Sequence, residues 1–207
     1  MRQGIFFVVS APSGTGKTTL CMRVRDRLEN LHFTVSYTTR EKRPAEENGR
    51  EYHFVDEPTF QKMREAGDFA EYANVYGNWY GTSLSELENN RNEGHDLLIE
   101  IDVQGAKNIK ARFPDAVLIF IHPPSMDVLR DRLNHRGTDG PEVIERRLGI
   151  AEAELRLMST YDYLIENRVI ETAEDDFAAI INAERLRCHR VLPELATAFP
   201  GIVPAKE

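Results

Sequence analysis

The chain has 207 residues, 41% of them hydrophobic, which is enough for one domain with small insertions and excludes extensive disorder. Its 26 Lys and Arg residues against 34 Asp and Glu residues give a formal charge of −8, so we expect no general nucleic-acid binding, and an anionic ligand must meet a local cluster of basic residues. Two cysteines cannot build a disulfide scaffold, and the apolar runs are too short for a membrane span or a signal peptide, so we expect a cytoplasmic protein with no membrane partner.

The chain opens with a predicted strand, loop and helix. Residues 5–9 are all apolar, as in a strand that is covered on both faces of a parallel sheet. Small residues follow, and then Leu20, Val24 and Leu28 recur at helical spacing. The alternation returns later, with strands at 97–101, 117–121 and 163–165 and helices at 103–112, after Ser125, from Pro141 and around Phe177. This order predicts an α/β fold with a mostly parallel sheet flanked by helices.

Residues 34–83 interrupt this alternation. They are rich in Thr, Tyr, Glu and Arg, and they contain Asn-Gly and Gly-Asn turn signals at 48–49 and 77–78. We expect a helix that begins near Asp56 and ends before Gly67, and short strands at 52–55 and 70–75. The segment is interpreted as an inserted small α+β subdomain.

Residues 11–18 (APSGTGKT) match the P-loop pattern, with Ala11 in place of its first glycine. Glycines let backbone N–H groups turn toward phosphate oxygens, Lys17 can reach the terminal phosphates, and the Thr18 hydroxyl can hold Mg²⁺. An incidental glycine-rich turn is the alternative, but the preceding strand and following helix are the context that the motif requires. Glu100-Ile101-Asp102 ends a later strand where a nucleotide-binding sheet places a carboxylate, although acidic strand ends are common.

Further motifs stand in one order along the chain: residues 36–52 (SYTTREKRPAEENGREY), 69–72 (FAEY), 77–82 (GNWYGT), 101–105 (IDVQG), 132–138 (RLNHRGT) and 161–163 (YDY). Together with the P-loop they resemble guanylate kinases over nearly the whole chain, and Ala11 is also common in bacterial members. The resemblance implies a P-loop kinase fold, with a core at 1–33, 84–125 and 160–193, a GMP-binding subdomain at 34–83 and a helical lid at 126–159.

The resemblance also implies a reaction, in which the γ-phosphoryl group of MgATP passes to GMP or dGMP with Mg²⁺ as cofactor. It leaves the oligomeric state open. It places ATP against Ala11, Pro12, Ser13, Gly14, Thr15, Gly16, Lys17, Thr18, Arg132 and Arg136. It places GMP against Ser36, Arg40, Arg43, Glu46, Tyr52, Glu71, Tyr80, Thr82 and Asp102. The expected catalytic residues are Lys17, Arg40, Arg136 and Arg147, and the expected metal ligands are Thr18 and Asp102, the latter directly or through water.

The chemistry of the GMP residues agrees with these roles. The guanidinium groups of Arg40 and Arg43 suit phosphate oxygens, although taken alone they also fit a solvated loop paired with glutamates. Guanine offers donors at N1 and N2 and an acceptor at O6. Carboxylates such as Glu71 can read the donors and hydroxyls such as Thr82 can donate to O6, although either could be an ordinary strand or turn residue.

The predicted lid joins two helices through a flexible polar break at 134–141. Arg132 and Arg136 are four residues apart and share a helix face, and Arg147 follows the break. Lid closure would bring arginine charge onto the transferring phosphoryl group and exclude water. A charged helix surface is the alternative, because nearby acidic residues nearly balance these arginines. The tail from Pro193 is interpreted as a loose end.

Three other functions remain open at this point. The first is a different small-molecule P-loop kinase, against which the Glu71, Tyr80 and Thr82 set argues. The second is a non-catalytic guanylate-kinase-like interaction module, which typically lacks the intact phosphate loop seen here. The third is a regulatory GTPase, but the chain has no Asn-Lys-x-Asp motif.

Overall fold

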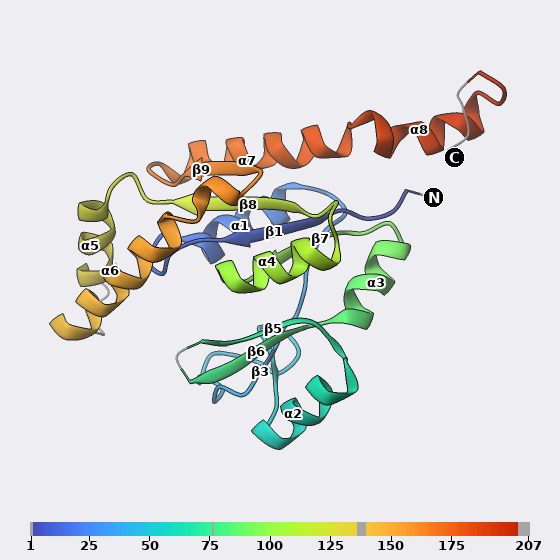
Figure 1. Ribbon diagram of the computed structural model, residues 1–207. Helices are drawn as coiled ribbons and strands as arrows, with labels where there is room; N and C mark the ends of the chain where they lie inside the picture. Colours follow the sequence, from blue (N-terminus) through green and yellow to red (C-terminus); the bar gives the residue numbers. More distant parts are fainter. Residues whose placement is uncertain (1, 76, 136–139, 203–207) are drawn as a thin grey trace.

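The computed structural model describes residues 2–75, 77–135 and 140–202, and two β-sheets organise them (Figure 1). The larger sheet is parallel throughout, with the order β2 (Leu31–Phe33), β7 (Asp96–Glu100), β1 (Phe6–Ser10), β8 (Val117–His122), β9 (Tyr163–Glu166). The smaller sheet has the order β4 (His53–Phe54), β3 (Tyr37–Thr38), β6 (Asn78–Ser83), β5 (Phe69–Val75), and only its β3–β4 pair is parallel. The predicted α/β class and mostly parallel sheet are confirmed.

Helices cover both faces of the larger sheet. Side chains of α1 (Lys17–Arg27) and α7 (Ile170–Arg185) pack on one face, and those of α3 (Leu84–Asn92) and α4 (Val103–Arg112) pack on the other. The helices α5 (Met126–His135) and α6 (Pro141–Leu155) form their own apolar cluster. The remaining helices are α2 (Glu57–Ala66), the short 3₁₀ helix η1 (Met158–Thr160) and α8 (Cys188–Ala198). Within the described ranges, no helix is both long enough and apolar enough to cross a membrane.

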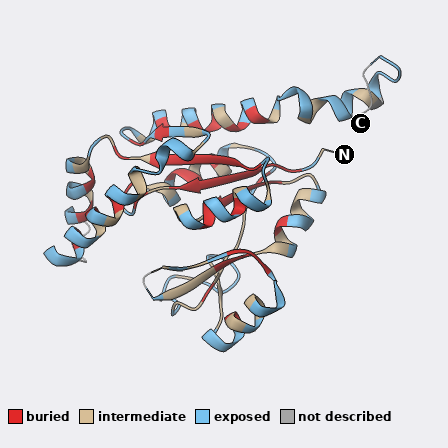
Figure 2. Ribbon diagram, viewed as in Figure 1, coloured by how far each residue is buried: buried red, intermediate tan, exposed pale blue. Residues whose placement is uncertain are grey.

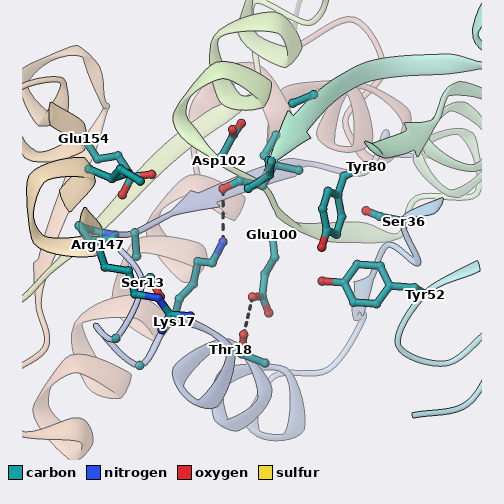
Figure 3. Close-up of a pocket in the computed structure, with 18 of the residues that line it drawn as sticks. Ser13, Lys17, Thr18, Ser36, Tyr52, Tyr80, Glu100, Asp102, Arg147 and Glu154 are labelled. Atoms are coloured by element: carbon teal, nitrogen blue, oxygen red, sulfur yellow. Dashed lines mark hydrogen bonds between the residues drawn. The ribbon is translucent and has the colours of Figure 1, made fainter. Parts of the chain in front are cut away.

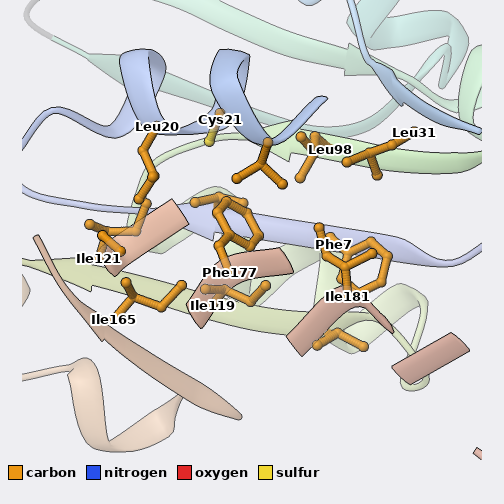
Figure 4. Close-up of a cluster of buried hydrophobic side chains, with 14 of the residues drawn as sticks. Phe7, Leu20, Cys21, Leu31, Leu98, Ile119, Ile121, Ile165, Phe177 and Ile181 are labelled. Atoms are coloured by element: carbon orange, nitrogen blue, oxygen red, sulfur yellow. The ribbon is translucent and has the colours of Figure 1, made fainter. Parts of the chain in front are cut away.

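The core lies on both sides of β1, whose five residues are all buried (Figure 2). Phe7 and Val9 point to the face that carries α1 and α7, where Phe7, Leu20 and Phe177 belong to one cluster (Figure 4). Phe6 and Val8 point to the opposite face and pack with residues of α4. The uninterrupted apolar run at 5–9 thus reflects a strand that is covered twice, as predicted.

The predicted elements agree with the structure at several boundaries. The Asp56 carboxylate accepts the Thr59 N–H at 3.0 Å and caps α2, and Gly67 ends that helix with a φ of +78°. The predicted break at 134–141 is shorter in the structure, because Asn134 and His135 belong to α5 and Pro141 begins α6; residues 136–139 lie outside the described residues.

Other elements differ from the prediction. The interpretation of the tail from Pro193 as a loose end was wrong for residues up to Ala198, because α8 continues through Pro193 to Ala198; residues 203–207 lie outside the described residues. A proline inside a helix removes its own N–H donor and crowds the carbonyl four residues before it, which can kink a helix without ending it. The short strand β2 and the helix α3 were not predicted, since each carries a single buried side chain, Leu31 and Leu87.

Candidate active site

A cleft of about 460 Å³ opens between the two sheets and α6 (Figure 3). It is lined by the loop after β1, by β5 and β6, by the end of β7 and by α6, so it collects side chains that are far apart in the sequence. The predicted site residues that line it are Ala11, Pro12, Ser13, Gly14, Gly16, Lys17, Thr18, Ser36, Arg43, Tyr52, Glu71, Tyr80, Asp102 and Arg147. Thr15, Arg40, Glu46, Thr82 and Arg132 are not among the lining residues, and Arg136 lies outside the described residues.

The loop between β1 and α1 has the backbone shape that a phosphate cradle requires. Gly14 and Gly16 both have a φ of +92°, a left-handed conformation that glycine adopts without strain. Ala11 tolerates its place in the pattern, because the only non-glycine residue with a positive φ in the described ranges is Asn30. Gly16 caps α1, and the first turn of α1 contains no acidic residue, so the positive end of this helix can attract an anion.

Lys17 and Thr18 face the carboxyl end of β7. The Lys17 ammonium donates to the Ile101 carbonyl at 3.3 Å, and the Thr18 hydroxyl donates to Glu100 Oε2 at 3.0 Å (Figure 3). Asp102 also lines the cleft, but its Oδ1 caps α4 by accepting the Gly105 N–H at 2.8 Å. The structure therefore brings Glu100 to the P-loop threonine Thr18, whereas Asp102 was the carboxylate predicted for this place.

Glu71 is a buried carboxylate at the edge of the cleft. It lies opposite Thr82 in the β5–β6 ladder, and the Thr82 hydroxyl donates to Glu71 Oε1 at 2.6 Å. Burial raises the pKa of Glu71 to about 7, against the lowering effect of this hydrogen bond, and the charge of Asp102 adds to the rise. A Cβ atom on Gly105 would lie 2.7 Å from Glu71 Oε2, so a larger residue there would displace the Glu71 carboxylate.

Arginines and tyrosines of the 34–83 segment occupy the same side of the cleft. Tyr52 and Tyr80 both line it and pack edge to face, with ring centroids 5.8 Å apart. Arg40 lies behind them, with its guanidinium carbon 5.4 Å from the Tyr52 ring centroid and its NH2 group 2.7 Å from Glu46 Oε1. Glu46 also accepts the Arg43 N–H at 2.8 Å, so one carboxylate orders both arginine positions.

The helix α6 contributes Arg147, Ile150 and Glu154 to the cleft (Figure 3). Burial raises the pKa of Glu154 to about 7, although the positive charge of Lys17 acts in the opposite direction. Glu154 was not predicted from the sequence, although its position seven residues after Arg147 places both on one helix face. Ala73 and Val75 line the cleft from β5 and were not predicted either, because they give no signal in the sequence beyond their place in a strand.

Comparison with known proteins gives a consistent result. A family model described as "Guanylate kinase" matches residues 3–184. A guanylate kinase of Geobacter sulfurreducens is 46% identical over 96% of this chain and 98% of its own length, and one of Dechloromonas aromatica is 48% identical over 88% of this chain and 91% of its own. The crystal structure of guanylate kinase from Anaplasma phagocytophilum superimposes with a TM-score of 0.79 at 33% identity, covering 100% of this chain and 98% of that one.

Proposed function

The chain belongs to the guanylate kinase family, and we propose that it transfers the γ-phosphoryl group of MgATP to GMP or dGMP, giving ADP and GDP or dGDP. The observation that carries this proposal is that the P-loop and the buried carboxylate of Glu71 line one cleft. The P-loop side belongs to the proposed core at 1–33, 84–125 and 160–193. The other side belongs to the proposed GMP-binding subdomain at 34–83, and Arg147 belongs to the proposed lid at 126–159.

The P-loop side suits the ATP phosphates. Backbone N–H groups of residues 13–18 and the positive end of α1 bind phosphate oxygens, and Lys17 stands beside them. Arg147 supplies a further positive charge from α6. Because the chain as a whole carries a formal charge of −8, this local concentration of donors is what lets an acidic protein bind a polyanion.

The opposite side suits GMP. An ionised Glu71 is an acceptor only and can take the guanine N1 and N2 donors, and Asp102 lies nearby to share them. Adenine has an acceptor at N1, which would leave the Glu71 charge buried without a donor. Arg43, Tyr52 and Tyr80 line this side of the cleft, with Arg40 and Glu46 directly behind them, and we propose that they hold the phosphate of GMP.

The oxygen atoms near Thr18 fit Mg²⁺. The hydroxyl of Thr18 and the carboxylate of Glu100 are hard ligands, and Mg²⁺ on a nucleotide takes most of its remaining ligands from phosphates and water. Among the residues that the structure describes, no group of three or more His, Cys, Asp or Glu side chains could hold a metal ion by itself. We therefore propose Thr18 and Glu100 as the protein ligands, with Asp102 kept for the guanine. Bound there, Mg²⁺ would neutralise charge on the phosphates.

The proposed chemistry depends on positioning and charge neutralisation. The accepting phosphate of GMP is already anionic at neutral pH, so the transfer needs no strong general base. Lys17 and Arg147 stabilise the charge of the phosphoryl group in transit, and the cleft aligns donor and acceptor.

A coupled assay of ADP formation with GMP, dGMP, AMP, UMP and CMP tests the function. We expect turnover with GMP and dGMP alone. The Lys17→Ala variant should lose at least about 100-fold in kcat with an unchanged melting temperature, because it removes a preorganised charge at the reacting phosphate. Lys107→Ala changes an exposed lysine on α4 and serves as the control. Comparable turnover of another monophosphate, or ATP binding without GDP formation, would contradict the proposal.

A further inference from the structure

The chain crosses between the two sheets at residues 34–36, and its hydrogen bonds change partner there. Thr34 N–H donates to the Leu98 carbonyl of the larger sheet at 3.2 Å. Two residues later, the Ser36 carbonyl accepts the His53 N–H of the smaller sheet at 2.9 Å. Val35 therefore occupies the point at which the backbone leaves one sheet and joins the other.

The chain crosses back from the smaller sheet to the larger one after β6, and a side chain from this second crossing holds the Val35 N–H. Glu86 Oε1 accepts it at 3.2 Å. Glu86 stands in the first turn of α3, which begins directly after β6 and is capped by the Ser83 hydroxyl. The Leu84 N–H in turn donates to the Asp68 carbonyl beside β5 at 2.8 Å. A single carboxylate thus connects the outgoing and the returning crossings between the sheets.

The surroundings of Glu86 keep its carboxylate at this contact. The side chain is half-buried, and burial raises the pKa of Glu86, while the hydrogen bond from the Val35 N–H and the nearby His53 act in the opposite direction. His53 is itself fixed by stacking on Tyr37, with ring centroids 4.6 Å apart. A hydrogen bond to an ionised carboxylate away from full solvent contributes more than one between neutral groups.

We infer that Glu86 is a positioning residue for GMP: through the Val35 N–H it fixes Ser36 and sets the smaller sheet against the P-loop. Glu86 is not among the residues that line the cleft, so it acts without touching either nucleotide. This inference rests on the proposed function, because it assigns GMP to the side of the cleft that carries Ser36. The ATP side depends on the larger sheet and does not use this contact.

The test compares steady-state kinetics of three variants. Glu86→Ala should raise the KM for GMP about tenfold and leave the KM for ATP within about twofold. The reason is that the variant loses one charge-assisted hydrogen bond, which supports only the GMP side of the cleft. Glu86→Gln keeps an acceptor oxygen and should restore most of the GMP affinity. Glu88→Ala removes an exposed carboxylate from the same helix and is the matched control. Glu86→Met, similar in length and without an acceptor, replaces the alanine variant if that variant unfolds.

Amide hydrogen exchange at Val35 tests the contact independently of catalysis. Exchange should be about tenfold faster in Glu86→Ala and unchanged in Glu88→Ala. An unchanged Val35 exchange rate, or equal rises of both KM values, would overturn the inference. If wild-type protein showed no GMP kinase activity, the proposed function would fail, while the exchange data would still report whether Glu86 holds the crossing.

Discussion

Glu71 shows how a residue can be costly for folding and useful for binding. Its carboxylate is buried beside Asp102, and one hydroxyl, that of Thr82, donates to it. In the free protein this leaves the carboxylate short of donors. GMP would supply two more from its guanine edge, which lowers the pKa of Glu71 when the nucleotide binds. Binding therefore recovers free energy that folding has lost at this position.

The Glu71→Gln variant tests this account through the pH dependence of stability. A pKa of about 7 in place of 4.5 means that the folded state binds an extra proton between these pH values, so wild-type stability falls as pH rises through this window. The variant avoids this loss and should be more stable than wild type at pH 8, by up to about 3 kcal/mol, with the advantage vanishing below about pH 4.5.

Urea unfolding at pH 8 and at pH 4.5, read by circular dichroism, measures the difference. The same variant should bind GMP more weakly and discriminate less well against AMP, because an amide presents a donor as well as an acceptor. A variant that gained no stability at pH 8, or kept wild-type GMP kinetics, would remove Glu71 from this role. A gain in stability together with a loss of function is the signature of a strained site residue.

At the scale of elements, α5 is attached to the P-loop. Arg132 of α5 donates to the Thr15 carbonyl at 3.3 Å and to the Asn167 carbonyl at 2.8 Å, and the Asn167 amide also donates to Thr15 at 2.7 Å. A Cβ atom on Gly14 would lie 2.9 Å from the Leu133 side chain, so helix and loop are in close contact. Arg132 therefore supports the phosphate loop from outside the cleft, whereas Arg147 of α6 lines the cleft itself.

Replacing Arg132 should therefore affect ATP and spare GMP. We expect Arg132→Ala to raise the KM for ATP about tenfold, since it removes one hydrogen bond to the loop and one to Asn167, whose amide also holds the loop. The KM for GMP should change less than twofold. Arg130 provides the control, because it is exposed on the same helix and pairs with Glu145. Initial rates measured at varied ATP and at varied GMP concentrations give the two KM values. An equal effect on both KM values would count against a role of Arg132 on the ATP side.

Across the whole molecule, the sequence predicted those strands and helices whose signals lie in a local pattern of residues. The apolar runs predicted β1 and β8, and the caps at Asp56 and Gly67 predicted α2. The pairing of Thr18 with Glu100 was not predictable, because it depends on the parallel register that sets Val9 beside Glu100. The contacts of Arg132 and Glu86 could not be predicted from the sequence either, since each side chain reaches a backbone group that only tertiary folding brings near.

In the larger sheet, the residues of the cleft and the buried ion-pair cluster around Asp96 lie at opposite ends of the strands. The cleft lies at the carboxyl ends of β1 and β7, while Asp96 begins β7 at the other edge, about 13 Å from Glu100 along the strand. Asp96 is fully buried and accepts from the Ile5 N–H at 2.8 Å, from Arg2 at 2.6 Å and from Arg185 at 2.8 Å. One carboxylate thus joins the start of the chain, the central sheet and α7.

The Asp96→Ala variant should lower the free energy of unfolding by about 3 kcal/mol, because it leaves two guanidinium groups and a buried N–H without their partner. Both KM values should stay within about twofold of wild type below the melting temperature, since the cleft keeps all of its lining residues. Asp26→Ala removes an exposed carboxylate from α1 and controls for the change in net charge. Urea unfolding gives the stability and initial rates give the KM values. If Asp96→Ala lost GMP or ATP affinity while remaining folded, the two edges of the sheet would be coupled, and this division between support and chemistry would be wrong.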